Sequence, residues 1–195
     1  MFAYTSAYGK LWPVLATRTC VLAPFDESDT EDLLAFFRDP QVRKYLWDDL
    51  EIDRATVVSV VQASLSEFAA GRCGMFCLRL AETAQRVQPT IIGFCGLRPA
   101  DYAPGAAELL YGLLPEYWGR GFATDAAEVV LRHAATATGL RRFVAATDAP
   151  NRASALVLER LGMHFEHKGN LHGLATLFYS LPVELFQSRY GAQVN

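Results

Sequence analysis

The chain carries, just past its middle, the stretch Trp118-Gly119-Arg120-Gly121-Phe122-Ala123-Thr124. An apolar run, Glu108 to Leu114, precedes it, and an alanine-rich run, Asp125 to Leu131, follows it. This order predicts a strand, a glycine turn and the start of a helix, where backbone N–H groups lack helical partners. Such a turn can hold an anion, which indicates a phosphate-bearing ligand. A turn that uses glycine only for its backbone geometry would give the same spacing.

Two widespread phosphate loops do not match this turn. The chain has no Gly-Lys-Ser or Gly-Lys-Thr sequence, so a P-loop nucleotidase would lack its lysine and its metal-binding hydroxyl. Thr124 stands where the dinucleotide-binding fingerprint has its third glycine. The turn also lies too far along the chain for the first strand–helix unit of that fold.

The size and composition of the chain predict one globular domain. It has 195 residues, of which 51% are hydrophobic and 20% charged, enough for a sizeable core. We expect a short N-terminal extension, residues 1–16, followed by a single domain, residues 17–195. The extension could pack on the domain or mediate a homodimer, and the sequence leaves both open. The net charge of −3 gives no reason to expect a nucleic acid partner.

The N-terminus has neither the charged-then-apolar order of a secretion signal nor the length of a membrane span. We therefore expect a cytoplasmic protein with no membrane partner. The cysteines lie in apolar, strand-like segments without a Cys-x-x-Cys pair, which predicts buried free thiols; they are Cys20, Cys73, Cys77 and Cys95. The four histidines have no metal-ligand spacing, and no metal is expected.

The apolar and turn patterns predict, in order, a strand, two helices, three strands, a helix, a strand, a helix and two strands. The first helix should begin at a capping box of Ser28 and Glu31 and end at Asp39-Pro40. A polar stretch, Glu82 to Pro89, is typical of a hairpin loop. This order indicates the α/β class, with antiparallel hairpins early and strand–helix crossovers late. The strands are expected at 18–25, 73–80, 90–97, 108–114, 142–147, 163–167 and 174–181, and the later helices at 52–70, 125–139 and 151–161.

Glu108 to Ala127 resembles the core motif of the GNAT N-acetyltransferase superfamily. Two later blocks resemble the next motif of that superfamily, Asn151 to Ser154 and Val157 to Met163. Upstream segments resemble the branch that contains the ribosomal-protein alanine N-acetyltransferases, Phe37 to Val42 and Ile92 to Leu97. Several motifs in the family's order make the resemblance specific, and it covers nearly the whole chain.

The resemblance implies a mostly antiparallel mixed sheet, splayed open at its centre and flanked by helices on both faces. It implies acetyl-CoA as co-substrate, with the pyrophosphate on the glycine turn and the pantetheine arm at the end of the preceding strand. Many family members have Gln or Arg at the position of Trp118, so we expect backbone N–H groups to hold the phosphates here. The implied donor-binding residues are Leu113, Leu114, Trp118, Gly119, Arg120, Gly121, Phe122, Ala123, Thr124, Asn151 and Ser154.

Acetyl transfer to an amine needs a base for the amine, a donor to the thioester oxygen and a proton for the leaving thiolate. Glu108 is the candidate base, because the alanines and leucines around it would desolvate its carboxylate and favour uptake of a proton. A solvent-facing or arginine-paired glutamate is an equally good interpretation. The backbone N–H of Leu113 is the expected donor to the thioester oxygen.

Much of the superfamily reprotonates the thiolate with a tyrosine, and Leu158 stands at that position. Ser154, one turn after Asn151, is the nearest replacement, and a serine there is thought to serve in the ribosomal-protein branch. Ser154 could instead cap or pack its helix and only lie near CoA. Asn151 could bond the pantetheine arm, cap the helix, or do both.

By the same resemblance, Tyr45, Trp47 and Tyr179 could line the acceptor pocket, although aromatic side chains are more often part of the core. The expected function is direct acetyl transfer within a ternary complex. The acceptor would be a protein or peptide N-terminus or a small amine. A non-catalytic acyl-CoA-binding sensor is the rival hypothesis, and the leucine at position 158 gives it weight.

Overall fold

A computed structural model describes residues 3–5, 11–82 and 90–191. These residues form an eight-stranded sheet, and a separate two-stranded sheet pairs β1 (Ala3–Thr5) with β2 (Leu11–Pro13). The α/β class predicted from the sequence is confirmed. From one edge to the other, the large sheet contains β3 (Leu15–Ala16), β4 (Cys20–Pro24), β5 (Met75–Leu80), β6 (Gly93–Pro99), β7 (Ala107–Leu113), β8 (Arg142–Asp148), β10 (Leu174–Pro182) and β9 (His164–Leu171).

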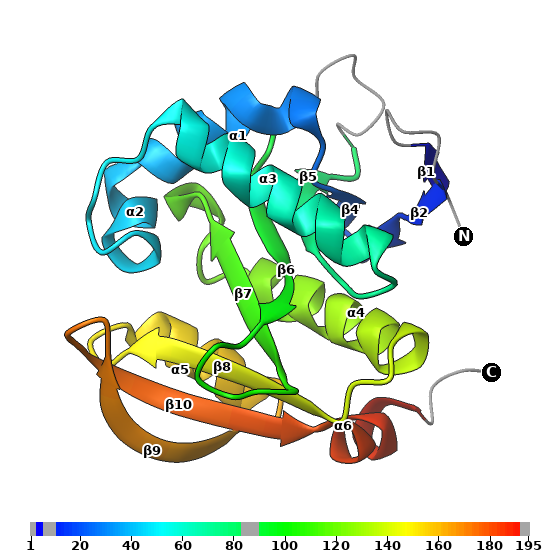
Figure 1. The fold of residues 1–195 in the computed structure, drawn as a ribbon, viewed down its shortest axis with the longest axis vertical. Helices are drawn as coiled ribbons and strands as arrows, with labels where there is room; N and C mark the ends of the chain where they lie inside the picture. The colour runs from blue at the N-terminus through cyan, green and yellow to red at the C-terminus, as the bar shows by residue number, and fades with distance from the viewer. Residues whose placement is uncertain (1–2, 6–10, 83–89, 192–195) are drawn as a thin grey trace.

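The large sheet opens at its centre, between β7 and β8. These two strands are parallel, whereas every other neighbouring pair in the large sheet is antiparallel. They share only two register pairs, Ala107 with Phe143 and Glu108 with Val144, and Figure 1 shows them separating beyond this point. The mostly antiparallel, centrally splayed sheet implied by the family resemblance is therefore observed.

Helices cover both faces of the sheet, with α1 (Thr30–Arg38) and α3 (Arg54–Ala69) over one face of β4 to β7 and α4 (Phe122–Ala137) over the other (Figure 1). α1 packs on β6 through Phe36 and Phe37, whose ring centroids lie 6.0 and 5.8 Å from that of Phe94. Alanines on the buried side of α4 let this helix lie close to the strands. The other helices of the described residues are α2 (Pro40–Leu46), α5 (Arg152–Arg160) and α6 (Val183–Tyr190), with short 3₁₀ turns at Glu27–Asp29 and Pro115–Tyr117.

The first helix ends at Asp39-Pro40 as predicted, but α2, which was not predicted, begins there at once. Pro40 lies in the first turn of α2, where a missing N–H group is tolerated. The Asp39 carboxylate accepts hydrogen bonds from the backbone N–H groups of Gln41 at 2.8 Å and Val42 at 3.1 Å. The prediction used Pro40 only as the end of a helix, whereas the capping carboxylate of Asp39 allows Pro40 to begin the next one.

The capping box before α1 uses different residues from those predicted. Asp26 accepts from the backbone N–H of Ser28 at 3.0 Å, and Asp29 accepts from the backbone N–H of Asp26 at 3.1 Å. Ser28 donates its hydroxyl to Asp26, and Glu31 forms an ion pair with Arg54. The prediction of a Ser28–Glu31 box is wrong because an aspartate two residues earlier takes the capping position.

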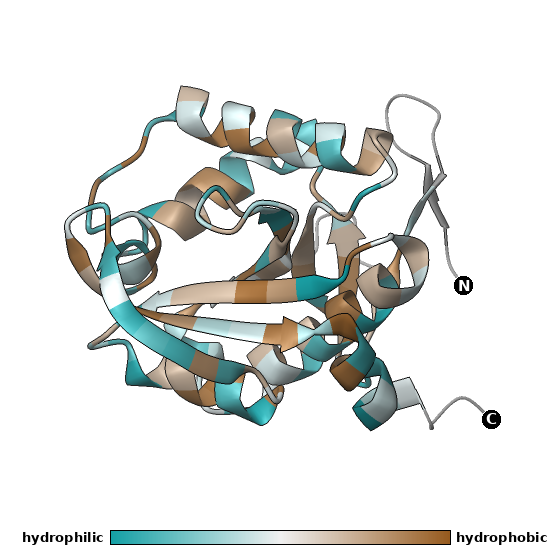
Figure 2. Ribbon diagram, turned by 60° about the horizontal axis from the view of Figure 1, so that its bottom comes forward, coloured by the Kyte–Doolittle hydropathy of each residue, from teal (hydrophilic) through white to brown (hydrophobic). Residues whose placement is uncertain are grey.

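The C-terminal part also differs from the prediction. β9 continues to Leu171, beyond the predicted end of this strand at residue 167, and the turn follows at His172 and Gly173. β9 is the outer strand of the sheet and is mostly hydrophilic (Figure 2), and most of its residues are exposed. The final helix, α6, was not predicted. The predicted hairpin loop at 82–89 lies, apart from Glu82, outside the described residues.

Part of the predicted N-terminal extension contacts the rest of the chain. Trp12 is buried, and its ring stacks at 5.4 Å on that of Phe68 in α3. β3 pairs with β4 and so belongs to the large sheet. The division into an extension, residues 1–16, and one domain, residues 17–195, stays a prediction, as does a homodimer.

The four cysteines are buried free thiols, as predicted. Burial raises the pKa of the Cys73 thiol to about 12, so this thiol stays protonated and unreactive near neutral pH. Across residues 3–5, 11–82 and 90–191, no three His, Cys, Asp or Glu side chains gather as they would around a metal ion. No helix in these ranges is both long and apolar enough to cross a bilayer.

Gly96 allows a close approach between β5 and β6. A Cβ atom at this position would lie 2.5 Å from Cα of Met75 and would also clash with the carbonyl oxygen of Gly74. We expect Gly96→Ala to lower the free energy of unfolding by about 1–3 kcal/mol, because the backbone of β5 would have to move. Urea unfolding measures this change. Gly139→Ala is the matched control, since a Cβ there meets no atom within 4 Å; equal losses in both variants would contradict the packing argument.

Candidate active site

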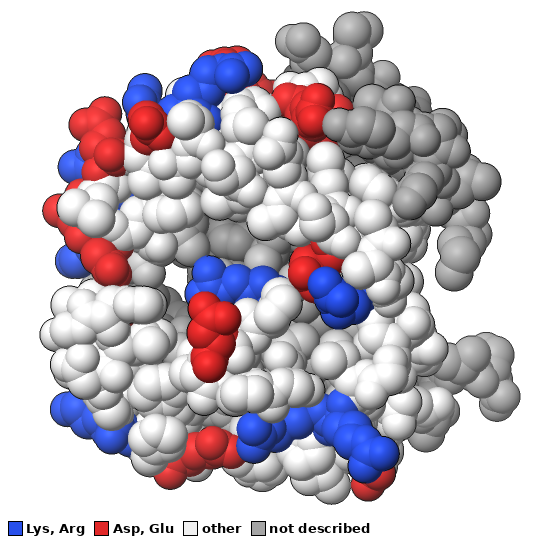
Figure 3. Space-filling view, in the orientation of Figure 1, with Lys and Arg blue, Asp and Glu red and all other residues white. Residues whose placement is uncertain are grey.

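A cavity of about 1070 Å³ occupies the opening between β7 and β8. Its walls come mainly from these two strands, from α2, α3 and α5, and from the first turn of α4. Figure 3 shows the corresponding face of the molecule hollowed between an upper and a lower half. Ligand pockets usually measure roughly 300–1,000 Å³, so this cavity has room for an extended ligand.

The edge of β7 that faces this cavity is unpaired over most of its length. The backbone N–H of Leu114 donates to the carbonyl oxygen of Ile92 at 2.9 Å, which places that N–H on the β6 side. Backbone groups alternate in direction along a strand, so those of Tyr111 and Leu113 face the opening. β8 has already diverged at this point. Apart from the Leu113 carbonyl oxygen, these groups must therefore be satisfied by a ligand or water.

One of these backbone groups is bonded within the chain. The indole Nε1 of Trp118 donates to the carbonyl oxygen of Leu113 at 2.7 Å. The Trp118 side chain thus folds back over the end of β7, although 46% of its surface remains exposed. The Leu113 carbonyl oxygen keeps one lone pair for a ligand, and a ligand that needs the position of the indole must displace it.

The glycine turn ends directly on the first turn of α4. Gly119 and Gly121 have left-handed backbone conformations, with φ of 69° and 87°, and Gly121 is the N-cap residue. The N–H of Asp125 donates to the Gly121 carbonyl oxygen at 3.0 Å, so the N–H groups of 122–124 precede the first helical bond and have no helical acceptor. Residues 121–124 line the cavity, where the positive end of the helix dipole favours an anion.

Side chains at this turn differ in what they offer a ligand. Thr124 Oγ1 is buried and has no hydrogen-bond partner among the described residues, a state that costs about 1–3 kcal/mol without a ligand or water. The guanidinium of Arg120 packs over the rings of Tyr117 and Phe122, at 5.8 and 5.0 Å from their centroids. Neither Arg120 nor Leu114 lines the cavity.

Glu108 is buried at the narrow end of the opening, in the last register pair that β7 makes with β8. Its Oε2 accepts from Arg98 Nε at 2.6 Å, and its Oε1 accepts from the Tyr102 hydroxyl at 3.1 Å. Burial and the Glu108 charge raise the pKa of Tyr102, so the phenol stays a donor. Of the two sequence interpretations without a catalytic role, the structure has the arginine-paired one, and the carboxylate also lines the cavity.

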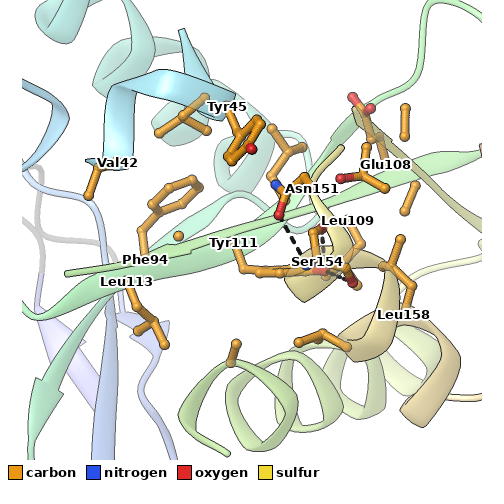
Figure 4. A pocket seen from close by; sticks show the side chains of 18 of the residues that line it. Val42, Tyr45, Phe94, Glu108, Leu109, Tyr111, Leu113, Asn151, Ser154 and Leu158 are labelled. Carbon is orange, nitrogen blue, oxygen red and sulfur yellow. Dashed lines mark hydrogen bonds between the residues drawn. The ribbon is translucent and has the colours of Figure 1, made fainter. Parts of the chain in front are cut away.

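Ser154 and Asn151 lie together at the start of α5 (Figure 4). The Asn151 side-chain oxygen accepts from the Ser154 N–H at 3.2 Å, so Asn151 caps the helix as the sequence allowed. The Ser154 hydroxyl lies 2.8 Å from the hydroxyl of Tyr111, a residue that the sequence analysis did not single out. Leu158 is 1% exposed and offers no polar atom to the cavity.

The three predicted acceptor-pocket aromatics are not brought together. Tyr45 and Trp47 line the cavity, and Trp47 packs on Phe37 with ring centroids 5.5 Å apart. The Trp47 Nε1 is buried without a hydrogen-bond partner in the described ranges. Tyr179 is 3% exposed, packs on Phe165 of β9 at 5.7 Å and does not line the cavity.

Two aspartates that line the cavity are near enough for their charges to interact. Asp48 comes from the loop after α2, and Asp148 comes from the end of β8. Burial raises the pKa of Asp148, and the negative charge of Asp48 raises it further. Asp48, Asp49 and His172 have left-handed backbones, which non-glycine residues rarely adopt. A positively charged group placed between these carboxylates would relieve their repulsion.

Comparison with known proteins agrees with this geometry. Residues 20–164 match the family model described as the acetyltransferase (GNAT) domain. The curated, uncharacterized N-acetyltransferase p20 of Bacillus licheniformis is 28% identical over 156 residues, which cover 78% of this chain and 83% of that protein.

Solved structures share the fold. An acetyltransferase from Agrobacterium tumefaciens is 24% identical with a TM-score of 0.73, covering 87% of this chain and 94% of that one. RimL, a ribosomal L7/L12 alpha-N-protein acetyltransferase solved in complex with coenzyme A, is 19% identical with a TM-score of 0.71, covering 89% and 99%. The family model spans most of the chain, and the family resemblance seen in the sequence is confirmed: the chain belongs to the GNAT family of N-acetyltransferases.

Proposed function

We propose that this chain transfers an acetyl group from acetyl-CoA directly to a primary amine. Acetyl transfer to an amine is the general reaction of the family, and the fold neighbour RimL has been solved with coenzyme A. The observation that carries the proposal is a single cavity that joins the unpaired edge of β7 to the free N–H groups at the start of α4. An extended ligand that ends in phosphates matches both parts.

In this proposal, the pyrophosphate of acetyl-CoA lies at the start of α4. The N–H groups of residues 122–124 and the unpartnered Thr124 hydroxyl support this placement. The pantetheine arm follows the open edge of β7 at Tyr111 and Leu113. The N–H of Leu113 is the proposed donor to the thioester oxygen as negative charge develops there.

The glycine turn would act through its backbone rather than through its side chains. The Trp118 indole is bonded to Leu113, and Arg120 is packed over two rings. A Cβ atom at Gly119 or at Gly121 would meet nothing within 4 Å, so the main chain is accessible on this side. These contacts support the expectation that main-chain N–H groups hold the phosphates.

Glu108 is the proposed base for the acceptor amine. Each of its carboxylate oxygens accepts one hydrogen bond and keeps a further lone pair, and the side chain lines the cavity. A carboxylate in this position can take a proton directly or through a water molecule. A positioned base contributes about 10²–10⁴-fold to the rate.

Ser154 is the proposed hydrogen-bond donor to the leaving thiolate. It lines the cavity, whereas Leu158, at the usual position of the family's tyrosine, is buried and apolar. A CoA-like thiol has a pKa near roughly 8.5 by analogy with cysteine, so its thiolate is a tolerable leaving group. One hydrogen bond is then enough to assist its departure.

The proposed acceptor is a protein or peptide N-terminus or a small amine. RimL, by its name, acetylates an α-amino group of a ribosomal protein, and the present chain has the same fold. Tyr45 and Trp47 offer apolar walls with polar tips, and Asp48 and Asp148 add negative charge. A positively charged acceptor is complementary to this part of the cavity.

A second candidate function is a non-catalytic sensor that binds acyl-CoA. The observation that favours it is that both candidate chemical groups are already bonded. Glu108 is held by Arg98 and Tyr102, and Ser154 is held by Tyr111. A sensor would bind acetyl-CoA without releasing its thiol in the presence of amines.

The two functions are separated by measuring thiol release from acetyl-CoA with a panel of amines. The panel contains peptides with free N-termini, the same peptides with blocked N-termini, amino acids and polyamines. We expect thiol release above the rate of hydrolysis only with free amines, because nitrogen must attack the thioester. Calorimetric binding of acetyl-CoA without turnover on any amine would favour the sensor and contradict the enzyme proposal.

The placement of the phosphates is tested by Gly121→Glu. The new side chain would enter the open space at the start of α4 and bring a negative charge to it, so we expect at least a hundredfold loss of CoA affinity by calorimetry, since about 2.8 kcal/mol is a hundredfold. Gly71→Glu is the matched control, because Gly71 has a similar φ of 73° and similar open space but lies after α3. Retained affinity in Gly121→Glu would contradict the assignment.

The role of Glu108 is tested by Glu108→Gln, which keeps the size of the side chain but accepts no proton. We expect kcat to fall about 10²-fold with an unchanged dissociation constant for CoA. Glu128→Gln, on the outer side of α4, also removes an arginine-paired carboxylate and should leave kcat unchanged. If Glu108→Gln keeps the wild-type rate from acid to alkaline pH, Glu108 is not the base.

A further inference from the structure

The opening between β7 and α5 is bridged by a pair of hydroxyl groups. The Tyr111 Oη lies 2.8 Å from Ser154 Oγ and 2.9 Å from the Ser154 carbonyl oxygen. Tyr111 is in the part of β7 that β8 has left, and both side chains line the cavity (Figure 4). No other hydrogen bond between β7 and α5 is found in the described residues.

The number of protons limits how this pair can bond. A phenol has a single proton, so Tyr111 donates either to the Ser154 carbonyl oxygen or to Ser154 Oγ. In the first arrangement, the serine hydroxyl donates back to Tyr111 and has no proton left for a ligand. In the second, Tyr111 donates to Ser154 Oγ, and the serine proton is free to face the cavity. The carbonyl oxygen keeps its bond within α5 in both cases.

We propose that Tyr111 is a positioning residue whose phenol donates to Ser154 Oγ and so turns the serine proton toward the leaving sulfur. This inference rests on the proposed acetyl transfer and on Ser154 as the donor. It supplies what Leu158 cannot, since a leucine has no hydroxyl to offer. The Tyr111 phenol therefore acts on the thiolate by orienting the Ser154 hydroxyl. It does so from β7, whereas position 158 lies on α5.

Three features of the structure hold the Tyr111–Ser154 pair in this arrangement. Burial raises the pKa of Tyr111, so its phenol keeps its proton throughout the neutral range. Asn151 holds the backbone N–H of Ser154 at 3.2 Å, which anchors the serine at the start of α5. The backbone of Tyr111 is held on its other edge, because β7 pairs with β6 along the whole strand. Little reorganisation is then needed when the thiolate forms.

The proton balance of the reaction needs no net change at Tyr111. A carbon–nitrogen bond forms, the carbon–sulfur bond of the thioester breaks, and the sulfur leaves with the electron pair. The amine nitrogen gives one proton to the proposed base Glu108, directly or through a water molecule, and the departed thiolate takes one proton from water. Ser154 donates a hydrogen bond to the sulfur during this transfer, and Tyr111 donates one to Ser154, so both hydroxyls end as they began.

The test is a double-mutant cycle of Tyr111→Phe, Ser154→Ala and the double variant. For each protein, we would measure kcat, the dissociation constant for CoA, and the pKa of the bound CoA thiol from the ultraviolet absorbance of its thiolate. We expect Tyr111→Phe to lower kcat about tenfold and to raise the bound-thiol pKa by about one unit, the size of one hydrogen bond. CoA affinity at a pH well below the thiol pKa should not change. Tyr190→Phe is the control, because Tyr190 is a partly buried tyrosine of α6 that packs on Phe186 away from the cavity, and this change should leave kcat and the thiol pKa unchanged.

If Tyr111 acts through Ser154, the double variant should match Ser154→Ala in both kcat and thiol pKa. Additive losses would show that Tyr111 acts on the sulfur directly or only supports the fold, and would overturn the inference. An unchanged thiol pKa in Tyr111→Phe would overturn it as well. The thiol titration needs no acceptor, so it decides the role of Tyr111 even if no amine is acetylated. A wild-type chain that binds no CoA would overturn both this inference and the proposed function.

Discussion

The short pairing between β7 and β8 is the constraint on which the rest of the structure depends. After two register pairs the strands separate, and backbone groups of β7 lose the partners that a continuous sheet would give them. Unpaired backbone groups cost free energy unless water or a ligand satisfies them. Within the β6–β7 wall, Glu108 is bonded to Arg98, and across the opening Tyr111 is bonded to Ser154. The cavity therefore follows from the divergence of the two strands and not from a packing defect.

Much of the fold could be predicted because its signals are local. The glycines before α4 require left-handed backbone, and the apolar runs of the strands are short and bounded by turns. The helices that were not predicted begin at residues that can have two structural roles. Pro40 can end one helix or begin the next, and the Asp39 carboxylate decides between them. α6 begins after Pro182 without a side-chain cap, so the sequence gives no sign of its start.

The site was predicted less completely, because its partners come from register and not from spacing. Arg98 lies directly opposite Glu108 in the β6–β7 ladder, and a sequence does not reveal which residues face each other. Tyr111 meets Ser154 only through the way α5 packs beside β7. Tyr179 follows a shift of register between β10 and β9, and such a shift changes which face a side chain takes. Periodicity alone could not place it.

The indole of Trp118 has a consequence for how a ligand leaves. Because the indole already bonds the Leu113 carbonyl oxygen, an incoming N–H that displaces it gains only the difference between two similar hydrogen bonds, a value near zero. The indole N–H and a ligand N–H would then exchange as donors to this carbonyl oxygen. In the proposed reaction, the indole would bond the Leu113 carbonyl again when CoA leaves, so this carbonyl would not hold the product back. Such an exchange would favour repeated turnover over tight retention.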